Sequence, residues 1–98
     1  MARLDSKGII RTLQENKVKL REMGVKRIGL FGSYLRNPKQ GSDLDFLVVF
    51  SRPTFDNYME LKFFLEQLFG KKVDLVVEAA LKPSMEYVKK EAVYAQGV

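Results

Sequence analysis

The sequence contains no cysteine and no histidine. These absences exclude disulfide bonds, thiol nucleophiles, histidine general bases and the usual zinc sites. No run approaches the roughly 20 apolar residues that a membrane-spanning helix needs. No charged and then apolar leader opens the chain, so we expect a cytoplasmic protein that makes no contact with a membrane. Any chemistry must therefore come from carboxylates, hydroxyls, amines or a hard metal ion bound by oxygen.

The length of 98 residues predicts one domain over residues 1–98. Apolar residues make up 46% of the chain, which is enough for a packed core. A domain of this size buries only part of its surface on folding, so its margin of stability is thin. We therefore expect the chain to lean on another subunit, as a hetero-oligomer or a homodimer.

The formal net charge of +5 is concentrated at the N-terminal end. Residues 1–27 hold eight Lys or Arg and three Asp or Glu, whereas the rest of the chain holds nine of each sign. A solvated helix face is the favoured interpretation, because charge patterning alone is a weak signal. A surface for a phosphate-rich or acidic partner is the sharper alternative.

Apolar periodicity divides the chain into alternating helices and strands. It predicts helices over 6–23, from about 54 to 70 and from 83 onward, and strands over 26–31, 43–50 and 72–77. Pro53, Gly24 and Gly70 stand at the expected breaks. The order predicts an α/β or α+β fold, in which a small mixed β-sheet of about three strands is covered by helices.

Two acids, Asp43 and Asp45, open the strongest strand. Strand side chains alternate between faces, so both carboxylates point the same way, whereas Leu44 and Phe46 point toward the core. Two carboxylates this close repel each other, and at least one pKa should rise unless something neutralises them. A divalent cation is the simple remedy, and Mg²⁺ takes one or two carboxylates and completes its shell with water and substrate phosphates.

Gly32 and Ser33 follow the first strand and open a turn. Glycine lets the backbone approach a phosphate closely. The amides of Ser33 and Tyr34 would lie at the start of a helical turn, which favours an anion, and the Ser33 hydroxyl adds a donor. This pattern predicts a phosphate site beside the metal site.

Asp74 interrupts the apolar third strand. If that strand lies beside the second, Asp74 can reach the same ions. A chain without histidine leaves it as the natural base for an incoming hydroxyl. A lone Gly-Ser or Asp-x-Asp is usually a turn or a helix cap, but their combination at this spacing, with Asp74 on a third strand, favours a nucleotide site.

The stretch from Gly32 to Asp45 resembles the signature of the nucleotidyltransferase superfamily related to DNA polymerase beta: a Gly-Ser, about ten residues, and Asp-x-Asp on a strand. In its short branch, the minimal nucleotidyltransferases, an arginine often follows where Arg36 stands. The stretches GSDLDFLVVF and KKVDLVVEAALKPSMEYVKKEAV are also similar to that branch. Asn37 and Pro38 depart from it, because many relatives have glycine after the arginine.

This resemblance implies a nucleotidyltransferase fold and the transfer of AMP from ATP to a hydroxyl. It implies that Gly32, Ser33 and Arg36 contact the triphosphate. It also implies that the catalytic residues Asp43, Asp45 and Asp74 bind Mg²⁺, with two ions expected. Members of the branch act as antitoxins that attach AMP to a tyrosine of a HEPN-domain toxin, so we expect a HEPN toxin as the partner.

Two further hypotheses stay open. The chain can be a binding module that neutralises its partner by contact alone. It can also be an RNA-directed transferase that uses the basic N-terminal helix. Nucleic acid is the less favoured partner, because that helix has no obvious aromatic platform on which bases would stack.

Overall fold

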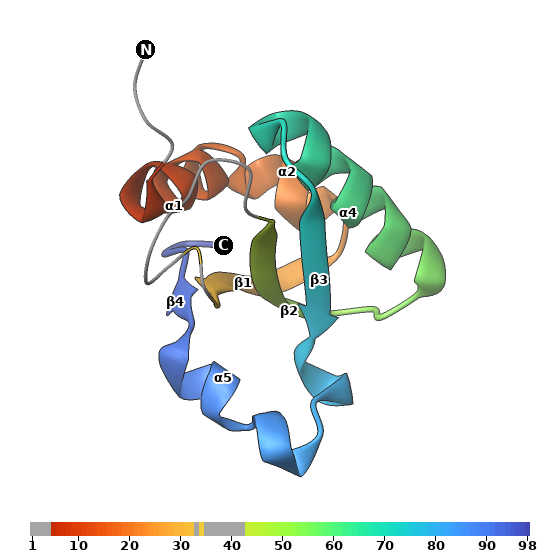
Figure 1. Cartoon of the computed structure of the whole chain (residues 1–98). Helices are drawn as coiled ribbons and strands as arrows, with labels where there is room; N and C mark the ends of the chain where they lie inside the picture. Colours follow the sequence, from red (N-terminus) through yellow and green to blue (C-terminus); the bar gives the residue numbers. More distant parts are fainter. Residues whose placement is uncertain (1–4, 33, 35–42) are drawn as a thin grey trace.

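One mixed β-sheet forms the centre of the part of the protein that the computed structural model describes, residues 5–32, 34 and 43–98 (Figure 1). Its four strands in this part are β1 (Val25–Phe31), β2 (Leu44–Phe50), β3 (Val73–Val77) and β4 (Val93–Tyr94). Their order is β3-β2-β1-β4, and β2 pairs in parallel with β3 and antiparallel with β1. The predicted mixed sheet covered by helices is confirmed, with one strand more than expected.

The additional strand, β4, follows a broken C-terminal segment. After β3 come two short 3₁₀ turns, η1 (Glu78–Ala80) and η2 (Pro83–Met85), and the helix α5 (Tyr87–Glu91). The strand β4 then pairs antiparallel with Gly29 and Leu30 at the edge of the sheet. The prediction of one helix from residue 83 onward is therefore wrong, because only Tyr87–Glu91 is α-helical and a strand follows. The sequence did not predict β4, because two residues are too few for an alternating pattern.

The predicted N-terminal helix is divided into α1 (Ser6–Glu15) and α2 (Lys17–Glu22). Asp5 caps α1 by accepting a hydrogen bond from the amide of Gly8. At Asn16 the side-chain Nδ2 donates to the Thr12 carbonyl oxygen at 2.8 Å. Asparagine competes in this way for backbone groups, which explains why one helix ends there and a second begins.

The long helix α4 (Phe55–Phe69) connects the parallel strands β2 and β3. The Thr54 side chain caps its start, and Gly70 ends it in the left-handed conformation with φ 63°. Both ends agree with the prediction. With α1 and α2 it covers one face of the sheet (Figure 1). No helix in the described ranges is long and apolar enough to cross a membrane.

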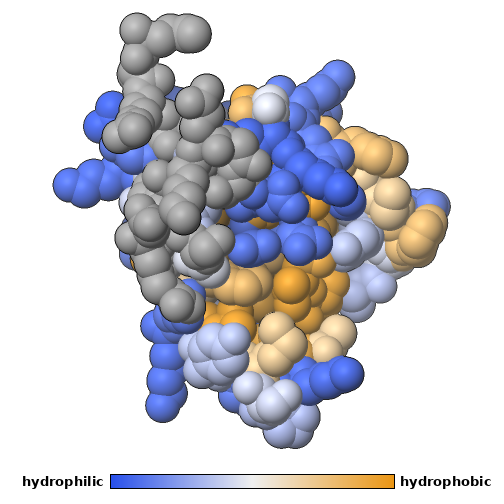
Figure 2. Space-filling model, viewed as in Figure 1, coloured by the Kyte–Doolittle hydropathy of each residue, from blue (hydrophilic) through white to orange (hydrophobic). Residues whose placement is uncertain are grey.

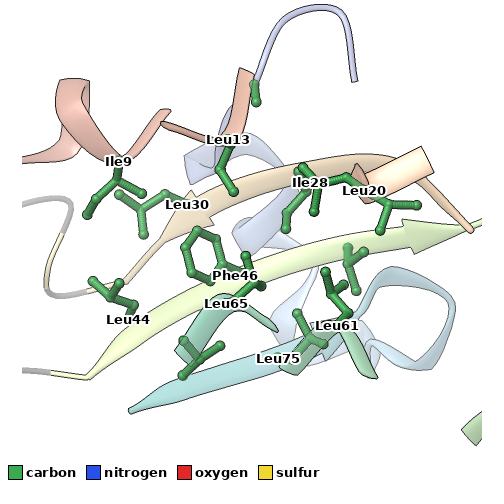
Figure 3. Packing of buried hydrophobic residues seen from close by; sticks show 14 of the residues in the cluster. Ile9, Leu13, Leu20, Ile28, Leu30, Leu44, Phe46, Leu61, Leu65 and Leu75 are labelled. Carbon is green, nitrogen blue, oxygen red and sulfur yellow. The ribbon is translucent and has the colours of Figure 1, made fainter. Parts of the chain in front are cut away.

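The main core fills the space between this face and the helices. Phe46, at the centre of β2, is fully buried and stacks on Phe69 with 5.8 Å between ring centroids. The Tyr58 hydroxyl donates to the Leu75 carbonyl oxygen at 2.8 Å, which joins α4 to β3. Figure 3 shows the side chains that meet there, among them Ile9, Leu13, Leu20, Ile28, Leu30, Leu44, Phe46, Leu61, Leu65 and Leu75.

The opposite face of the sheet carries a smaller apolar cluster. Phe31, Leu47 and Val88 are its buried members, and side chains from the C-terminal segment pack against them. In the view of Figure 2, hydrophobic side chains occupy the middle of the molecule and hydrophilic ones border them. The C-terminal segment therefore gives this face of the sheet a partial apolar cover.

Candidate functional site

Asp45 and Asp74 lie side by side on the second face of the sheet. They are register partners in the parallel pair of β2 and β3. Their chain neighbours Leu44 and Val73 are also partners, and both are buried in the main core. Because strand side chains alternate, the two carboxylates point away from that core together. The condition on which the prediction for Asp74 depended, that the third strand lies beside the second, is met.

Asp43 precedes β2 and brings a third negative charge to the same end of the sheet. Partial burial raises the pKa of the Asp45 carboxyl above its ordinary value, and the nearby charges of Asp74 and then Asp43 raise it further. The predicted repulsion between carboxylates is therefore present. Asp43 and Asp74 are exposed, which leaves this end of the sheet open to solvent.

The donor set at this end consists of carboxylate oxygens. Among the described residues, no three His, Cys, Asp or Glu side chains are gathered closely enough to hold one metal ion by themselves. Mg²⁺ requires only one or two carboxylates when water and phosphates supply its remaining ligands. Burial raises the Asp45 pKa most, and a cation between Asp45 and Asp74 would relieve the charge repulsion that adds to it, so the residues fit a hard divalent cation.

Gly32 lies directly against Asp45. Its neighbour Phe31 is the register partner of Asp45, and Gly32 itself has φ 87°, a conformation that favours glycine. A Cβ atom at position 32 would overlap the carboxylate of Asp45. The sequence predicted that this glycine allows a phosphate to approach. The structure places it against the acid instead, and the phosphate contact stays a prediction.

Ser33 and Arg36, the other residues predicted to contact the triphosphate, lie outside the described residues. Tyr34, which follows Ser33, has a helical backbone and is only 3% exposed within the main core. The ammonium nitrogen of Lys71 lies 5.6 Å from the centre of its ring. Tyr34 therefore anchors the chain immediately after Ser33.

Glu91 is a neighbour of this site that the sequence did not reveal. The amide of Gly32 donates a hydrogen bond to Glu91 Oε1 at 3.1 Å. The two residues are 59 positions apart, and Glu91 looks like an ordinary acid on a C-terminal helix. No local motif signals such a contact. Only the antiparallel pairing of β4 with β1, which returns the end of the chain to the site, could have suggested it.

A separate groove of about 310 Å³ lies between α1 and β4. Lys7 and Arg11 line it, together with the apolar side chains of Ile10 and Val93. Among the predicted site residues that the structure describes, Gly32, Asp43, Asp45 and Asp74, none lines it. Part of the excess positive charge of the N-terminal region therefore lines a groove that none of Asp43, Asp45 and Asp74 lines.

Known proteins resemble the chain in both sequence and fold. Residues 9–95 match the nucleotidyltransferase domain family. Protein adenylyltransferase MntA of Thermococcus cleftensis is 43% identical over 96% of this chain and 99% of its own length. A solved structure described as a "putative minimal nucleotidyltransferase" is 35% identical, with a TM-score of 0.77 over 95% of this chain and 98% of that one.

A more distant solved structure shares the fold. It is the complex of a tri-AMPylated HEPN toxin of Shewanella oneidensis with its MNT antitoxin, matched at 23% identity and a TM-score of 0.64 over 91% of this chain and 73% of that one. The match over residues 9–95 and the 43% identity to MntA bear out the resemblance first suggested by the Gly-Ser and Asp-x-Asp pattern. The chain therefore belongs to the nucleotidyltransferase domain family.

Proposed function

We propose that this protein transfers AMP from ATP to a tyrosine hydroxyl of a HEPN-domain toxin and thereby acts as its antitoxin. The observation that carries the proposal is the pairing of Asp45 with Asp74 beside Gly32, at an open end of the sheet. The 43% identity to a protein adenylyltransferase supports AMP transfer. The AMPylated HEPN toxin found with its MNT antitoxin supports this class of acceptor.

In the proposed mechanism, the acids and the glycine turn have different roles. Asp43, Asp45 and Asp74 would hold Mg²⁺, which when bound would neutralise phosphate charge and lower the pKa of a nearby hydroxyl. Gly32, Ser33 and Arg36 receive the triphosphate. Because Gly32 touches Asp45, a triphosphate held at the turn would lie next to the carboxylates.

The chemical step is one displacement at the α-phosphorus of ATP. The tyrosine oxygen forms a bond to that phosphorus, and the bond from phosphorus to the pyrophosphate oxygen breaks. Asp74 accepts the proton of the tyrosine hydroxyl. Its place on β3, at the exposed edge of the pair with Asp45, leaves it accessible to an incoming hydroxyl.

The exposure of the site favours a protein acceptor. The described residues build a sheet, one main layer of helices and a C-terminal cover over part of the second face. Asp43 and Asp74 stay exposed, and no further layer of described residues encloses them. A docked partner can form the missing wall and present its own tyrosine as the acceptor.

The test is to mix the protein with the HEPN-domain protein encoded beside it, Mg²⁺ and ATP, and to measure the intact mass of that protein. We expect a gain of one or more AMP units. The variant Asp43→Asn should abolish the gain, whereas Glu60→Gln, which neutralises an exposed acid on α4, should leave it unchanged. An unmodified toxin that both wild type and Asp43→Asn still inhibit would favour the binding module instead.

A further inference from the structure

Resting on the proposed function, we propose that Glu91 is a positioning residue for the nucleotide turn. Its carboxylate holds the backbone amide of Gly32, and binding of the triphosphate depends on that contact. The C-terminal segment would then be part of the site through this contact, although it carries none of the residues that the sequence motif identifies.

The contact satisfies a backbone amide at the end of β1. The Gly32 amide lies just beyond the last residue of β1 and donates to Glu91 Oε1 at 3.1 Å. A backbone N–H that is partly buried needs a partner, and a carboxylate is a strong one. Gly32 also has φ 87°, so its peptide lies in a region of backbone space that few other residues adopt.

Gly32 is held from a second side by Asp45. The Asp45 carboxylate lies where a side chain of residue 32 would otherwise be. The glycine is therefore placed between two carboxylates, one against its Cα and one on its amide. Tyr34, buried in the main core, anchors the chain on the far side of Ser33. Both neighbours of Ser33 are thus fixed by contacts outside the turn.

Glu91 is itself placed firmly. It is the last residue of α5, and Val88 in the same helix is buried against Phe31 and Leu47. The chain continues into β4, which pairs with Gly29 and Leu30 in β1. An acid at the C-terminal end of a helix faces unpaired carbonyl groups, so helix stability does not explain its presence there.

The alternative role for this carboxylate is to occupy the amide until a phosphate displaces it. The two roles predict different effects on Mg-ATP binding when the charge of residue 91 is removed and when its side chain is shortened. A residue that positions Gly32 needs an oxygen at the right distance, and glutamine supplies one without a charge. A residue that competes with phosphate acts through its charge, and aspartate keeps that charge while losing one methylene of reach.

The experiment measures the dissociation constant of Mg-ATP by calorimetry for wild type, Glu91→Gln, Glu91→Asp and Glu91→Ala, with melting temperatures alongside. Glu91→Gln should bind like wild type. Glu91→Asp and Glu91→Ala should bind about tenfold more weakly, which corresponds to about 1.4 kcal/mol. The control is Glu86→Ala, which removes a carboxylate beside α5 that pairs with Lys89 at 3.0 Å, and it should bind like wild type.

The other possible results of this binding experiment lead to different conclusions about Glu91. If wild type does not bind Mg-ATP, the proposed function fails before Glu91 is tested. If wild type binds and Glu91→Asp and Glu91→Ala bind equally well, Glu91 has no positioning role, even where their melting temperatures fall. If Glu91→Gln and Glu91→Ala both bind more tightly, the carboxylate competes with phosphate. Should Glu91→Ala fail to fold, weaker binding by Glu91→Asp still tests the positioning role, and tighter binding by Glu91→Gln still tests the competition with phosphate.

Discussion

The two faces of the sheet carry different kinds of side chain. The face under α1, α2 and α4 contributes only apolar side chains to its core, with alternate residues of β2 fully or nearly fully buried. On the other face, Asp45 and Leu47 lie on the same side of β2. A carboxylate that the charges of Asp74 and Asp43 repel is therefore next to a buried leucine. Stability is concentrated on the first face and the proposed chemistry on the second.

This difference shows how a small chain can carry a strained site. A core on one face tolerates carboxylate repulsion on the other, because the two sets of side chains never meet across the strand. The second face then needs only a partial cover, which the segment from η1 to β4 supplies through Val88 and its neighbours. Substitutions on the first face should therefore affect folding, and those on the second should affect binding.

The largest effect is expected from Phe46→Ala on the first face. Phe46 is fully buried and stacks on Phe69, so its removal leaves a cavity in the main core. Such a truncation costs about 3–5 kcal/mol, a large part of the 5–15 kcal/mol that typically stabilises a domain. Urea denaturation followed by circular dichroism measures the loss.

The matched control is Phe63→Ala in α4. Phe63 is 58% exposed, so its removal opens no cavity, and the free energy of unfolding should change by no more than about 0.5 kcal/mol. Equal losses in the two variants would show that the helix-covered face is not the main source of stability.

An intermediate effect is expected from Gly32→Ala. The new Cβ atom would overlap the Asp45 carboxylate, and φ 87° strains any residue other than glycine. We expect a loss of about 1–3 kcal/mol in stability, together with a loss of Mg-ATP binding. Gly70→Ala is the control: it has φ 63° but no atom within 4 Å of the new Cβ, so it should cost about 1 kcal/mol and leave binding intact.

The smallest effect on stability is expected from Asp45→Asn. Burial, and then the charges of Asp74 and Asp43, raise the pKa of the Asp45 carboxyl, and this variant removes that partly buried charge. The metal-free protein should therefore melt at the same temperature as wild type or higher. Mg²⁺ should raise the melting temperature of wild type by binding the folded state, and it should raise that of Asp45→Asn much less. Glu60→Gln should respond like wild type. If Mg²⁺ raises the melting temperature of Asp45→Asn as much as that of wild type, the ion binds elsewhere.

The sequence predicted those features that depend on local pattern. Alternation in residues 43–50 put Leu44 and Phe46 in the core and Asp45 on the other face, as observed. Gly70 also marked the end of α4, because it acts within its own turn of the chain. The pairing of Asp45 with Asp74 followed once the second and third strands were taken as neighbours.

The features that the sequence missed depend on contacts between distant residues. The strand β4 exists because the chain returns to the edge of β1, and two residues carry no periodic signal of that return. The bond from Gly32 to Glu91 spans 59 positions. The division of the first helix at Asn16 reflects a side-chain bond to Thr12 that competes with the helix, which apolar periodicity cannot register.

The most direct test of the central claim follows the label of ATP into the HEPN-domain protein. The protein and this partner are incubated with Mg²⁺ and with ATP labelled on either the α- or the γ-phosphate, and the partner is then isolated. The account predicts that label enters the partner from α-labelled ATP and not from γ-labelled ATP, and that Asp74→Asn binds ATP yet transfers nothing. Label from γ-labelled ATP, or transfer undiminished in Asp74→Asn, would contradict it.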